Sequence, residues 1–467
     1  MECRGGLLTF KEYLDKLKNK RVAVVGAGVS NTPLIEALLS AGVDTTICDK
    51  NARDELGKTA TRFEEHGARL KLGEAYLDKL DADVIFRTPG LMPTNPALVE
   101  AVRRGAKLTS EMEAFFDIKP CRIIAVTGSD GKTTTTTIIA ELLKRQGFTT
   151  HIGGNIGTPL LCNADEFRPD DIAVLELSSF QLITMKKSPD IAVFTNLSPN
   201  HLDVHADMEE YASAKRNIFQ HQRQTDRAVF NYDNEYTRKM AGSAPGETLF
   251  FSRCGQISDG VYLDEGIIYD VSNGRREVIM QARDILLPGA HNLENYMAAF
   301  TAVRGLVDHR IMMETAGAFN GVKHRIELVR ELSGVRYYND SIASSPSRTI
   351  AGLRAFDRKV ILIAGGKDKG IPFDDLGAEI IKHVKTLVLT GKTAQQIKKA
   401  VITRPGYNGL PEIFLCPDFT DAVFAASNAA GEGDIVLLSP ACTSFDSFKN
   451  FEERGEKFRE IVEGLVG

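Results

Sequence analysis

The residues best suited to do chemistry lie in a glycine-rich segment that directly follows an apolar run. Residues 127–134 read Thr-Gly-Ser-Asp-Gly-Lys-Thr-Thr, and residues 122–126 read Arg-Ile-Ile-Ala-Val. In a strand, glycine turn and helix of this kind, backbone N–H groups surround phosphates. We therefore expect Lys132 to contact the β- and γ-phosphates of a nucleotide and the Thr133 hydroxyl to bind Mg²⁺. The full pattern requires a glycine where Val126 stands, so the alternative is a turn before a core helix.

A nucleotide site also needs a carboxylate at a strand end to hold the metal. Glu176 ends the apolar run Asp-Ile-Ala-Val-Leu-Glu, and the next predicted strand ends at Asn196 and continues to His201. Glu176 alone would equally suit a solvent-facing strand end, and a loop histidine is more often simply solvated. The order of these residues favours one site, because open α/β sheets gather ligands at the carboxyl ends of their strands.

Two stretches of the predicted nucleotide-binding region can be explained as solvent-exposed helix without a functional role. Lys215 lies in a helix-like stretch whose charges match an ordinary solvated face, and the residues alone do not distinguish it from Arg216. Thr is a poor helix former, so Thr135 to Thr137 are expected to form a solvated first turn. Only Thr133 and Thr134 then require a functional explanation.

Both ends of the chain carry further polar residues after predicted strands. Residues 22–31 resemble the start of a dinucleotide-binding fold, but Asn31 stands where the third glycine is expected. Asp49 ends the second strand, where an acid could bind a ribose or a base edge. NAD binding, nucleotide-sugar binding and a helix-packing turn all remain open. Near the other end, residues 337–349 and 439–455 are rich in small polar side chains and are predicted to be strand-to-helix loops.

The elements that must position these residues alternate between strands and helices. A short β-branched strand, a glycine-containing loop and a helix recur at 20–42, 121–147 and 358–373. Continuous apolar runs that alternate with helices are typical of buried parallel strands, so we predict an α/β fold with one sheet in each of three domains. Residues 245–290 resemble short antiparallel strands joined by Gly and Asp turns. Domain boundaries are expected near residues 111 and 321.

Composition narrows the class of partner. The 467 residues carry a formal net charge of -5, which does not indicate a basic surface for binding nucleic acid or an anionic membrane. The start of the chain has no apolar signal core, and no apolar run approaches the roughly 18 residues of a spanning helix. The seven cysteines are scattered without a Cys-x-x-Cys pair, which argues against disulfides or a zinc site. We expect a cytoplasmic monomer that binds small molecules.

Seven segments in this order resemble the Mur ligase family over almost the whole chain: TGSDGKTT, GGNIGTPL, ELSSFQL, HNLENYMAA, HRIE, YYNDS and SPACTSFDSFKNFEERG. The resemblance implies Rossmann-like domains at 1–111 and 322–467, for a UDP-sugar-peptide and an amino acid, around a P-loop ATPase-like domain at 112–321. ATP would phosphorylate the carboxylate of UDP-N-acetylmuramoyl-L-alanine, and the amine of D-glutamate would displace the phosphate, in peptidoglycan precursor synthesis. The last segment favours this D-glutamate-adding reaction. Another amide ligase of Mur or folylpolyglutamate type is the alternative.

The resemblance also implies a role for each matching residue. The catalytic residues would be Lys132, Glu176, His201 and Lys215. ATP would contact Gly128, Ser129, Asp130, Gly131, Lys132, Thr133, Thr134, Asn295, Arg325 and Asp340. Two Mg²⁺ sites would use Thr133, Glu176, His201 and Lys215, the last as a carbamate. The UDP-sugar-peptide would contact Ser30, Asn31, Asp49, Lys50, Thr88, Gly90 and Asn155. D-Glutamate would contact Ser344, Lys369, Ser444 and Phe451. In two places the chain leaves the assignment open, because Ile342 stands where the family often has Lys and Lys367 is an alternative to Lys369.

Overall fold

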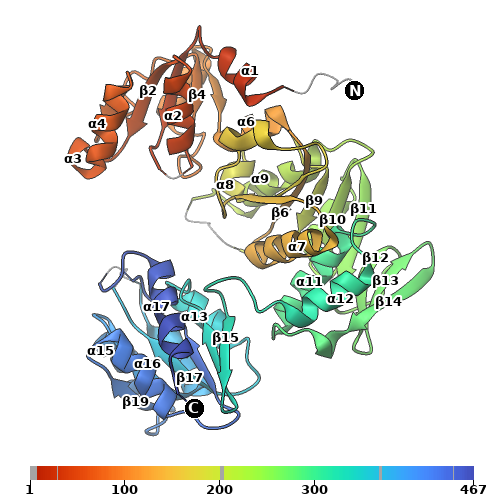
Figure 1. Ribbon diagram of the computed structural model, residues 1–467, viewed down its shortest axis with the longest axis vertical. Helices are drawn as coiled ribbons and strands as arrows, with labels where there is room; N and C mark the ends of the chain where they lie inside the picture. The colour runs from red at the N-terminus through yellow and green to blue at the C-terminus, as the bar shows by residue number, and fades with distance from the viewer. Residues whose placement is uncertain (1–7, 29, 200–203, 368–370, 445, 467) are drawn as a thin grey trace. The chain divides into compact units, whose positions relative to one another are not determined.

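The chain builds three largely parallel sheets with helices between their strands (Figure 1). The computed structural model describes residues 8–28, 30–199, 204–367, 371–444 and 446–466. Two compact units divide the chain, one of Met1–Arg283 with Glu294–Thr315 and the other of Asp284–Leu293 with Ala316–Gly467. The predicted α/β class with one sheet in each of three regions is confirmed. The boundaries proposed near residues 111 and 321 stay predictions.

The first sheet is five-stranded and entirely parallel, in the order β3-β2-β1-β4-β5. Its strands are β1 (Arg21–Val25), β2 (Asp44–Asp49), β3 (Arg69–Leu72), β4 (Val84–Phe86) and β5 (Lys107–Thr109). The helices of this region are α1 (Phe10–Asp15), α2 (Thr32–Ser40), α3 (Arg53–Leu56), α4 (Lys58–Glu65) and α5 (Pro96–Arg103). The order reverses between β1 and β4, and such a switch point is where open parallel sheets bind ligands.

The second sheet has nine strands in the order β14-β13-β12-β11-β10-β9-β6-β8-β7. They are β6 (Arg122–Thr127), β7 (Thr150–Gly154), β8 (Ile172–Glu176), β9 (Ile191–Phe194), β10 (Arg227–Asn231), β11 (Glu247–Ser252), β12 (Gly260–Asp264), β13 (Ile267–Ser272) and β14 (Arg275–Gln281). The helices of this region are α6 (Glu111–Ile118), α7 (Lys132–Gln146), η1 (Leu161–Glu166), α8 (Ser179–Leu182), α9 (Met208–Gln220), α10 (Glu235–Ala241), η2 (Ala282–Asp284), α11 (Ala290–Ala302) and α12 (His309–Ala318).

The prediction of antiparallel strands throughout 245–290 is wrong for β11, which pairs in parallel with both β10 and β12. Helix α10 forms the crossover that a parallel β10–β11 pair requires. Gly260 permits the close approach to β11, because a Cβ there would lie 1.8 Å from the Phe250 carbonyl oxygen. Only β12, β13 and β14 pair antiparallel, through turns at 265–266 and 273–274. Both residues of each turn have positive φ, as two-residue hairpins favour.

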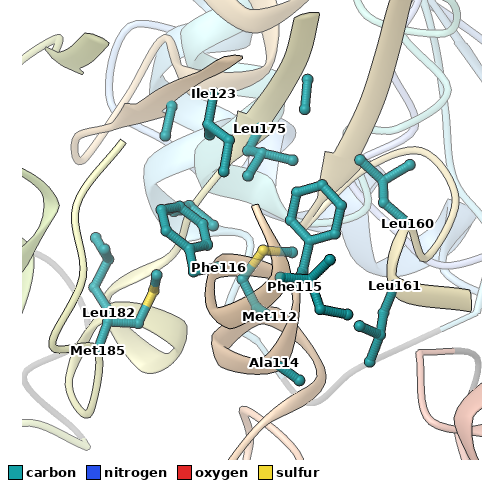
Figure 2. Packing of buried hydrophobic residues seen from close by; sticks show 14 of the residues in the cluster. Met112, Ala114, Phe115, Phe116, Ile123, Leu160, Leu161, Leu175, Leu182 and Met185 are labelled. Carbon is teal, nitrogen blue, oxygen red and sulfur yellow. The ribbon is translucent and has the colours of Figure 1, made fainter. Parts of the chain in front are cut away.

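Helix α6 packs its apolar face into the core beside the second sheet. Figure 2 shows Met112, Phe115 and Phe116 of this helix among side chains from the sheet and from the segments after β7 and β8. The labelled neighbours are Ile123, Leu160, Leu161, Leu175, Leu182 and Met185. All of these side chains are buried, so α6 is fixed by apolar burial on the side that faces the sheet.

The third sheet is six-stranded, in the order β15-β16-β20-β17-β18-β19. Its strands are β15 (Glu327–Leu332), β16 (Val335–Asn339), β17 (Val360–Ala364), β18 (Val384–Leu389), β19 (Glu412–Leu415) and β20 (Ile435–Leu438). Only the edge strand β15 is antiparallel. The helices are α13 (Pro346–Leu353), α14 (Asp374–His383), α15 (Ala394–Ile402), α16 (Phe419–Asn428) and α17 (Phe451–Glu463).

Candidate active site

The phosphate loop joins β6 to α7, and α7 begins at Lys132 as predicted. Gly128 has φ of +153°, and a Cβ there would lie 1.9 Å from Thr195 Oγ1. Gly131 has φ of +78°, and a Cβ there would lie 2.2 Å from Asn295 Oδ1. Val126 lies inside β6, where it pairs with Val193 and Glu176 on the neighbouring strands. The position that lacks the expected glycine therefore belongs to the sheet and not to the loop.

The side chains around the start of α7 converge on the loop. Lys132 Nζ donates to the carbonyl oxygens of Gly128 and Ser129 at 3.0 and 2.8 Å. The backbone N–H of Asp130 donates to Asn196 Oδ1 at 2.9 Å, so the end of β9 supports the loop from the other side. The free backbone N–H groups of a helix N-terminus and a nearby ammonium group together favour an anionic ligand.

The threonine run is buried from Thr133 to Thr136, so the prediction of a solvated first turn is wrong for Thr135 and Thr136, whereas Thr137 is half-buried. The side chains of Thr135 and Thr136 are fully enclosed, and those of Thr133 and Thr134 are nearly so. Thr135 Oγ1 lies 3.3 Å from Asn295 Oδ1, which connects α7 to α11. The hydroxyl groups of Thr133 and Thr135 bond other side chains, which lets them be buried, whereas the buried Thr136 hydroxyl has no partner among the described residues.

Glu176 ends β8 and is 2% exposed. Its Oε2 accepts a hydrogen bond from Thr133 Oγ1 at 2.6 Å, and its Oε1 accepts one from Asn155 Nδ2 at 3.0 Å. In the described part of the chain, no Lys or Arg forms a salt bridge with this carboxylate. The structure thus brings Asn155 to Thr133 and Glu176, which were predicted to share a metal site, and it corrects the alternative in which Glu176 faces water.

Lys215 is also buried, so the prediction of a solvated face is wrong for this residue. It is 1% exposed, and its Nζ donates to the Gly128 carbonyl oxygen at 2.8 Å and to Thr127 Oγ1 at 3.3 Å. The ammonium group lies 4.8 Å from the centre of the Tyr211 ring. Burial and the charge of Lys132 lower the pKa of Lys215 well below its usual value. An amine in this setting is readily neutral, and therefore nucleophilic.

Two residues near this site were missed by sequence reasoning. Tyr211 shares a hydrogen bond of 3.2 Å between its hydroxyl and Ser129 Oγ, which ties α9 to the phosphate loop. His205 is buried, with Nε2 3.0 Å from Ser179 Oγ and its ring stacked on Phe180. The predicted metal ligand His201 lies outside the described residues. Among those described, no group of three or more His, Cys, Asp or Glu side chains could hold a metal ion.

The first sheet gathers its predicted residues around the loop after β1. Asn31 donates its amide to the carbonyl oxygens of Val25 and Gly26 at 3.1 and 2.9 Å. Asp49 accepts from the backbone N–H of Ala27 at 2.7 Å. Both buried side chains therefore shape the loop. Asn31 does so from the position where a third glycine was expected.

The remaining predicted residues of the first sheet border the same edge. Ser30, Lys50 and Gly90 are exposed. Thr88 follows β4 and lies against the loop after β1, because a Cβ on Gly26 would be 3.0 Å from the Thr88 Cβ. The structure thus brings these residues to the carboxyl ends of β1, β2 and β4, which is the switch point of the sheet.

The third sheet places a buried carboxyl group at the end of β16. Asp340 is 4% exposed and accepts from Ser439 Oγ at 2.8 Å. Burial raises the pKa of Asp340 to about 7, and the hydrogen bond from Ser439 and the charge of Arg325 oppose this rise. Arg325 is therefore close enough to act on the carboxyl group that sequence reasoning paired with it.

The loops predicted to hold an amino acid are joined by a buried arginine that sequence reasoning missed. Arg454 donates from Nη2 to the Ser341 carbonyl oxygen at 2.8 Å and from Nη1 to the Cys442 carbonyl oxygen at 3.2 Å. Phe451 begins α17, and its carbonyl oxygen accepts from Ser341 Oγ at 2.8 Å. These bonds hold the segments after β16 and β20 together.

The other predicted amino-acid contacts have different outcomes. Ser444 is buried beside this cluster, whereas Ser344 is half-buried after β16. Lys369 lies outside the described residues. Its alternative, Lys367, is exposed and pairs by its backbone with Thr443. Ile342, which stands where a Lys was expected, is half-buried, and its N–H donates to the His324 carbonyl oxygen at 3.1 Å.

Comparison with known proteins assigns the chain to a family. The profile of the Mur ligase middle domain matches residues 126–303, and that of the Mur ligase glutamate ligase domain matches 324–442. A UDP-N-acetylmuramoylalanine–D-glutamate ligase of Acetivibrio thermocellus is 51% identical over 458 residues, covering 97% of this chain and 98% of the relative. One of Clostridium novyi is 49% identical over 464 residues, covering 98% and 99%. The chain belongs to the Mur ligase family.

Solved structures of Mur ligases share this fold. The UDP-N-acetylmuramate–alanine ligase of Thermotoga maritima aligns with a TM-score of 0.57 at 17% identity, covering 95% of this chain and 99% of that chain. The MurF ligase of Thermotoga maritima, solved in complex with ADP, aligns with a TM-score of 0.53 at 19% identity and covers 96% of both. In this Mur ligase, no helix of the described residues is long and apolar enough to cross a membrane.

Proposed function

We propose that this Mur ligase joins D-glutamate to UDP-N-acetylmuramoyl-L-alanine, with conversion of ATP to ADP and phosphate, in peptidoglycan precursor synthesis. Identity near 50% to relatives of this name, over nearly the whole length of each chain, is the observation that carries the proposal. The phosphate loop, the buried Glu176 and the buried Lys215 supply the parts that an acid-activating ligase needs.

The phosphate loop would bind ATP with its glycines, the start of α7 and Lys132. Gly128 and Gly131 keep the loop free of side chains, and at both positions a Cβ would collide with a neighbouring side chain. Lys132 would turn from its own loop carbonyls to the β- and γ-phosphates and balance the charge that develops on the transferred phosphoryl group. Asn295, which lies against Gly131, is the proposed adenine contact.

The oxygen donors beside the loop fit Mg²⁺. Thr133 Oγ1 and Glu176 Oε2 lie 2.6 Å apart, and hard cations of this size prefer hydroxyl and carboxylate oxygens. A buried carboxylate that forms no salt bridge with a Lys or Arg among the described residues also suits a cation. Bound there, Mg²⁺ would neutralise charge between the β- and γ-phosphates.

Lys215 is the proposed source of a second anionic ligand. Its neutral amine would add to CO₂ and release a proton, which gives an anionic carbamate. Burial and the nearby Lys132 favour the neutral amine that this step requires. With His201, the carbamate would hold a second Mg²⁺.

The reaction would proceed in two displacements. A carboxylate oxygen of the UDP-linked substrate attacks the γ-phosphorus, and ADP leaves. The neutral amine of D-glutamate then attacks the acyl carbon, and the tetrahedral intermediate expels phosphate and loses a proton to give the amide. The chain contributes by orienting the reactants and balancing charge, which are the main effects in phosphoryl transfer.

The outer regions would recognise the UDP-linked substrate and D-glutamate. We propose that the UDP-sugar-peptide binds at the carboxyl edge of the first sheet, with Asn155 of the second sheet near its peptide end. D-Glutamate would bind in the C-terminal unit, at Ser344, Ser444 and Phe451 with Lys369 or Lys367. Arg325 and Asp340 would contact the nucleotide. The corresponding domains are 1–111, 112–321 and 322–467, in a chain proposed to act as a cytoplasmic monomer.

Phosphate release tests the proposed function. The chain is mixed with ATP, Mg²⁺, UDP-N-acetylmuramoyl-L-alanine and either D- or L-glutamate, and each component is omitted in turn. We expect release only when all are present and only with D-glutamate. No release, or equal release with L-glutamate, would contradict the proposal, and release with a folate or with the next peptide precursor would assign a different ligase.

A further inference from the structure

Arg87 is a fully enclosed cation that joins the turn at 88–90, predicted to contact the UDP-sugar-peptide, to the segment around α8. It follows β4 and precedes the turn at 88–90. Nη1 donates to the Leu91 carbonyl oxygen at 3.1 Å and lies 3.4 and 3.5 Å from the carbonyl oxygens of Pro89 and Thr88. Nη2 donates to the Phe180 carbonyl oxygen at 2.6 Å and to Thr184 Oγ1 at 3.1 Å. One guanidinium group therefore holds the turn after β4 against the segment around α8.

The hydroxyl group of Thr184 links the positive charge of Arg87 to the carboxylate of Glu113. Thr184 Oγ1 accepts from Arg87 and donates to Glu113 Oε2 at 3.1 Å, and Ser110 Oγ donates to the same oxygen at 2.9 Å. Glu113 lies on α6, whose neighbouring side chains are packed into the core (Figure 2). A buried charge is costly unless it is compensated, so Arg87, Thr184 and Glu113 form one unit.

The unit is asymmetric in its access to solvent. A cavity of about 1160 Å³ is lined by Glu113 and Thr184 and also by apolar residues such as Phe116 and Ile183. Arg87 does not line this cavity, and its Nε is buried without a partner among the described residues. The anionic end therefore borders open space, whereas the cationic end is sealed between the two segments it joins.

The two segments that Arg87 joins would hold opposite ends of the proposed substrate. The turn at 88–90 lies at the edge of the first sheet that would take the uridine end. Phe180 lies in α8, four residues after Glu176, which ends β8 where the substrate carboxylate would be phosphorylated. A substrate that is held at both ends reacts only if the two holding points keep their spacing.

We propose that Arg87 is a positioning residue that fixes this spacing through Thr184 and Glu113. The inference rests on the proposed function, because it concerns how the UDP-linked substrate is held. In this role Arg87 holds two segments of the protein together and does not touch a reacting atom. Loss of the guanidinium should therefore affect the UDP-linked substrate and leave the sites for ATP and D-glutamate intact.

The test compares Arg87→Met with the wild type and with Arg304→Met. Arg304 is a matched control, because it is a mostly buried arginine that pairs with Asp259 and Asp270 at the far edge of the second sheet. For Arg87→Met we expect kcat/KM for the UDP-linked substrate to fall about tenfold to a hundredfold. The KM values for ATP and D-glutamate should stay within about twofold, as expected for distant, independent sites. Arg304→Met should lower the melting temperature without this selectivity.

Binding without turnover gives a second readout. The rise in melting temperature caused by UDP-N-acetylmuramoyl-L-alanine should shrink in Arg87→Met, while the rise caused by ATP is retained. An inactive wild type that still shows the UDP-substrate shift would contradict the proposed function alone. A wild type and Arg87→Met with equal UDP-substrate shifts and equal kinetics would overturn the role of Arg87.

Thr184→Val keeps the test decisive if Arg87→Met does not fold. This substitution preserves shape and removes only the hydroxyl that links Arg87 to Glu113. We expect the same substrate selectivity with a loss of about threefold to tenfold, the size of one hydrogen bond. An equal loss for all three substrates, or no loss, would show that the cluster does not position the UDP-linked substrate.

Discussion

Replacing Gly131 by Ala should destabilise the phosphate loop through two separable effects. The backbone of Gly131 has φ of +78°, and a residue with a Cβ pays about 1–2 kcal/mol in this left-handed region. The new Cβ would also lie 2.2 Å from Asn295 Oδ1, so that side chain must move and lose its contact with Thr135 Oγ1. A lost hydrogen bond adds about 1 kcal/mol. We expect the free energy of unfolding to fall by about 2–3 kcal/mol in total.

A double-mutant cycle separates the two effects. In an Asn295→Ala background the steric conflict is absent, so Gly131→Ala should cost only the backbone contribution and the two substitutions should couple by about 1 kcal/mol. Gly147→Ala is the matched control, because Gly147 caps the same helix with φ of +105° and a Cβ there would have nothing within 4 Å. Urea denaturation measures all of these variants. A clash with Asn295 is excluded if Gly131→Ala costs no more than Gly147→Ala, or costs the same in both backgrounds.

Three further predictions concern charged side chains. Lys132→Ala should lower phosphate release at least about a hundredfold, and near-normal turnover would exclude Lys132 from the phosphate site. Lys215→Ala should lose activity that short carboxylic acids partly restore, whereas Arg216→Ala should need no such rescue; unimpaired Lys215→Ala would contradict the carbamate. For Asp340, a folded-state pKa of about 7 against an unfolded value near 3.8 means that the folded state binds the extra proton. Its stabilising contribution is therefore lost as the pH rises, by roughly 2–3 kcal/mol between pH 5 and pH 8. Urea denaturation at both pH values should show this loss in the wild type and not in Asp340→Asn.

The parallel strands could be predicted from the sequence, but the direction of one strand could not. Runs such as 122–127 and 172–176 are apolar without alternation, which is typical of strands covered on both faces. The segment of β11 contains Thr and two Phe residues, which suit a strand that runs in either direction. Its direction is decided by α10, which carries the chain back across the sheet, and by Gly260, which lets β12 approach. Strand direction therefore depends on contacts that are remote in the sequence.

The polar residues of the site show where local patterns could have been applied further. Tyr211, Lys215 and Ile218 follow the spacing of one helical face, and all three are buried. Lys215 therefore stands on the apolar side of α9, whereas Arg216 is turned about 100° away. Helical periodicity alone could have separated the two basic residues.

Burial of a cation on an apolar face has a physical meaning that composition does not carry. An ammonium group there must find acceptors, lose its proton or be modified, because desolvation without compensation is costly. Lys215 has acceptors in Gly128 and Thr127 and a strongly lowered pKa. Arg87 cannot lose its proton so readily, and it is instead surrounded by carbonyl and hydroxyl oxygens. Both residues thus bond carbonyl and hydroxyl oxygens, but only Lys215 can also lose its proton readily. Each set of bonds fixes a segment of the site: Lys215 holds the phosphate loop, and Arg87 holds the turn after β4.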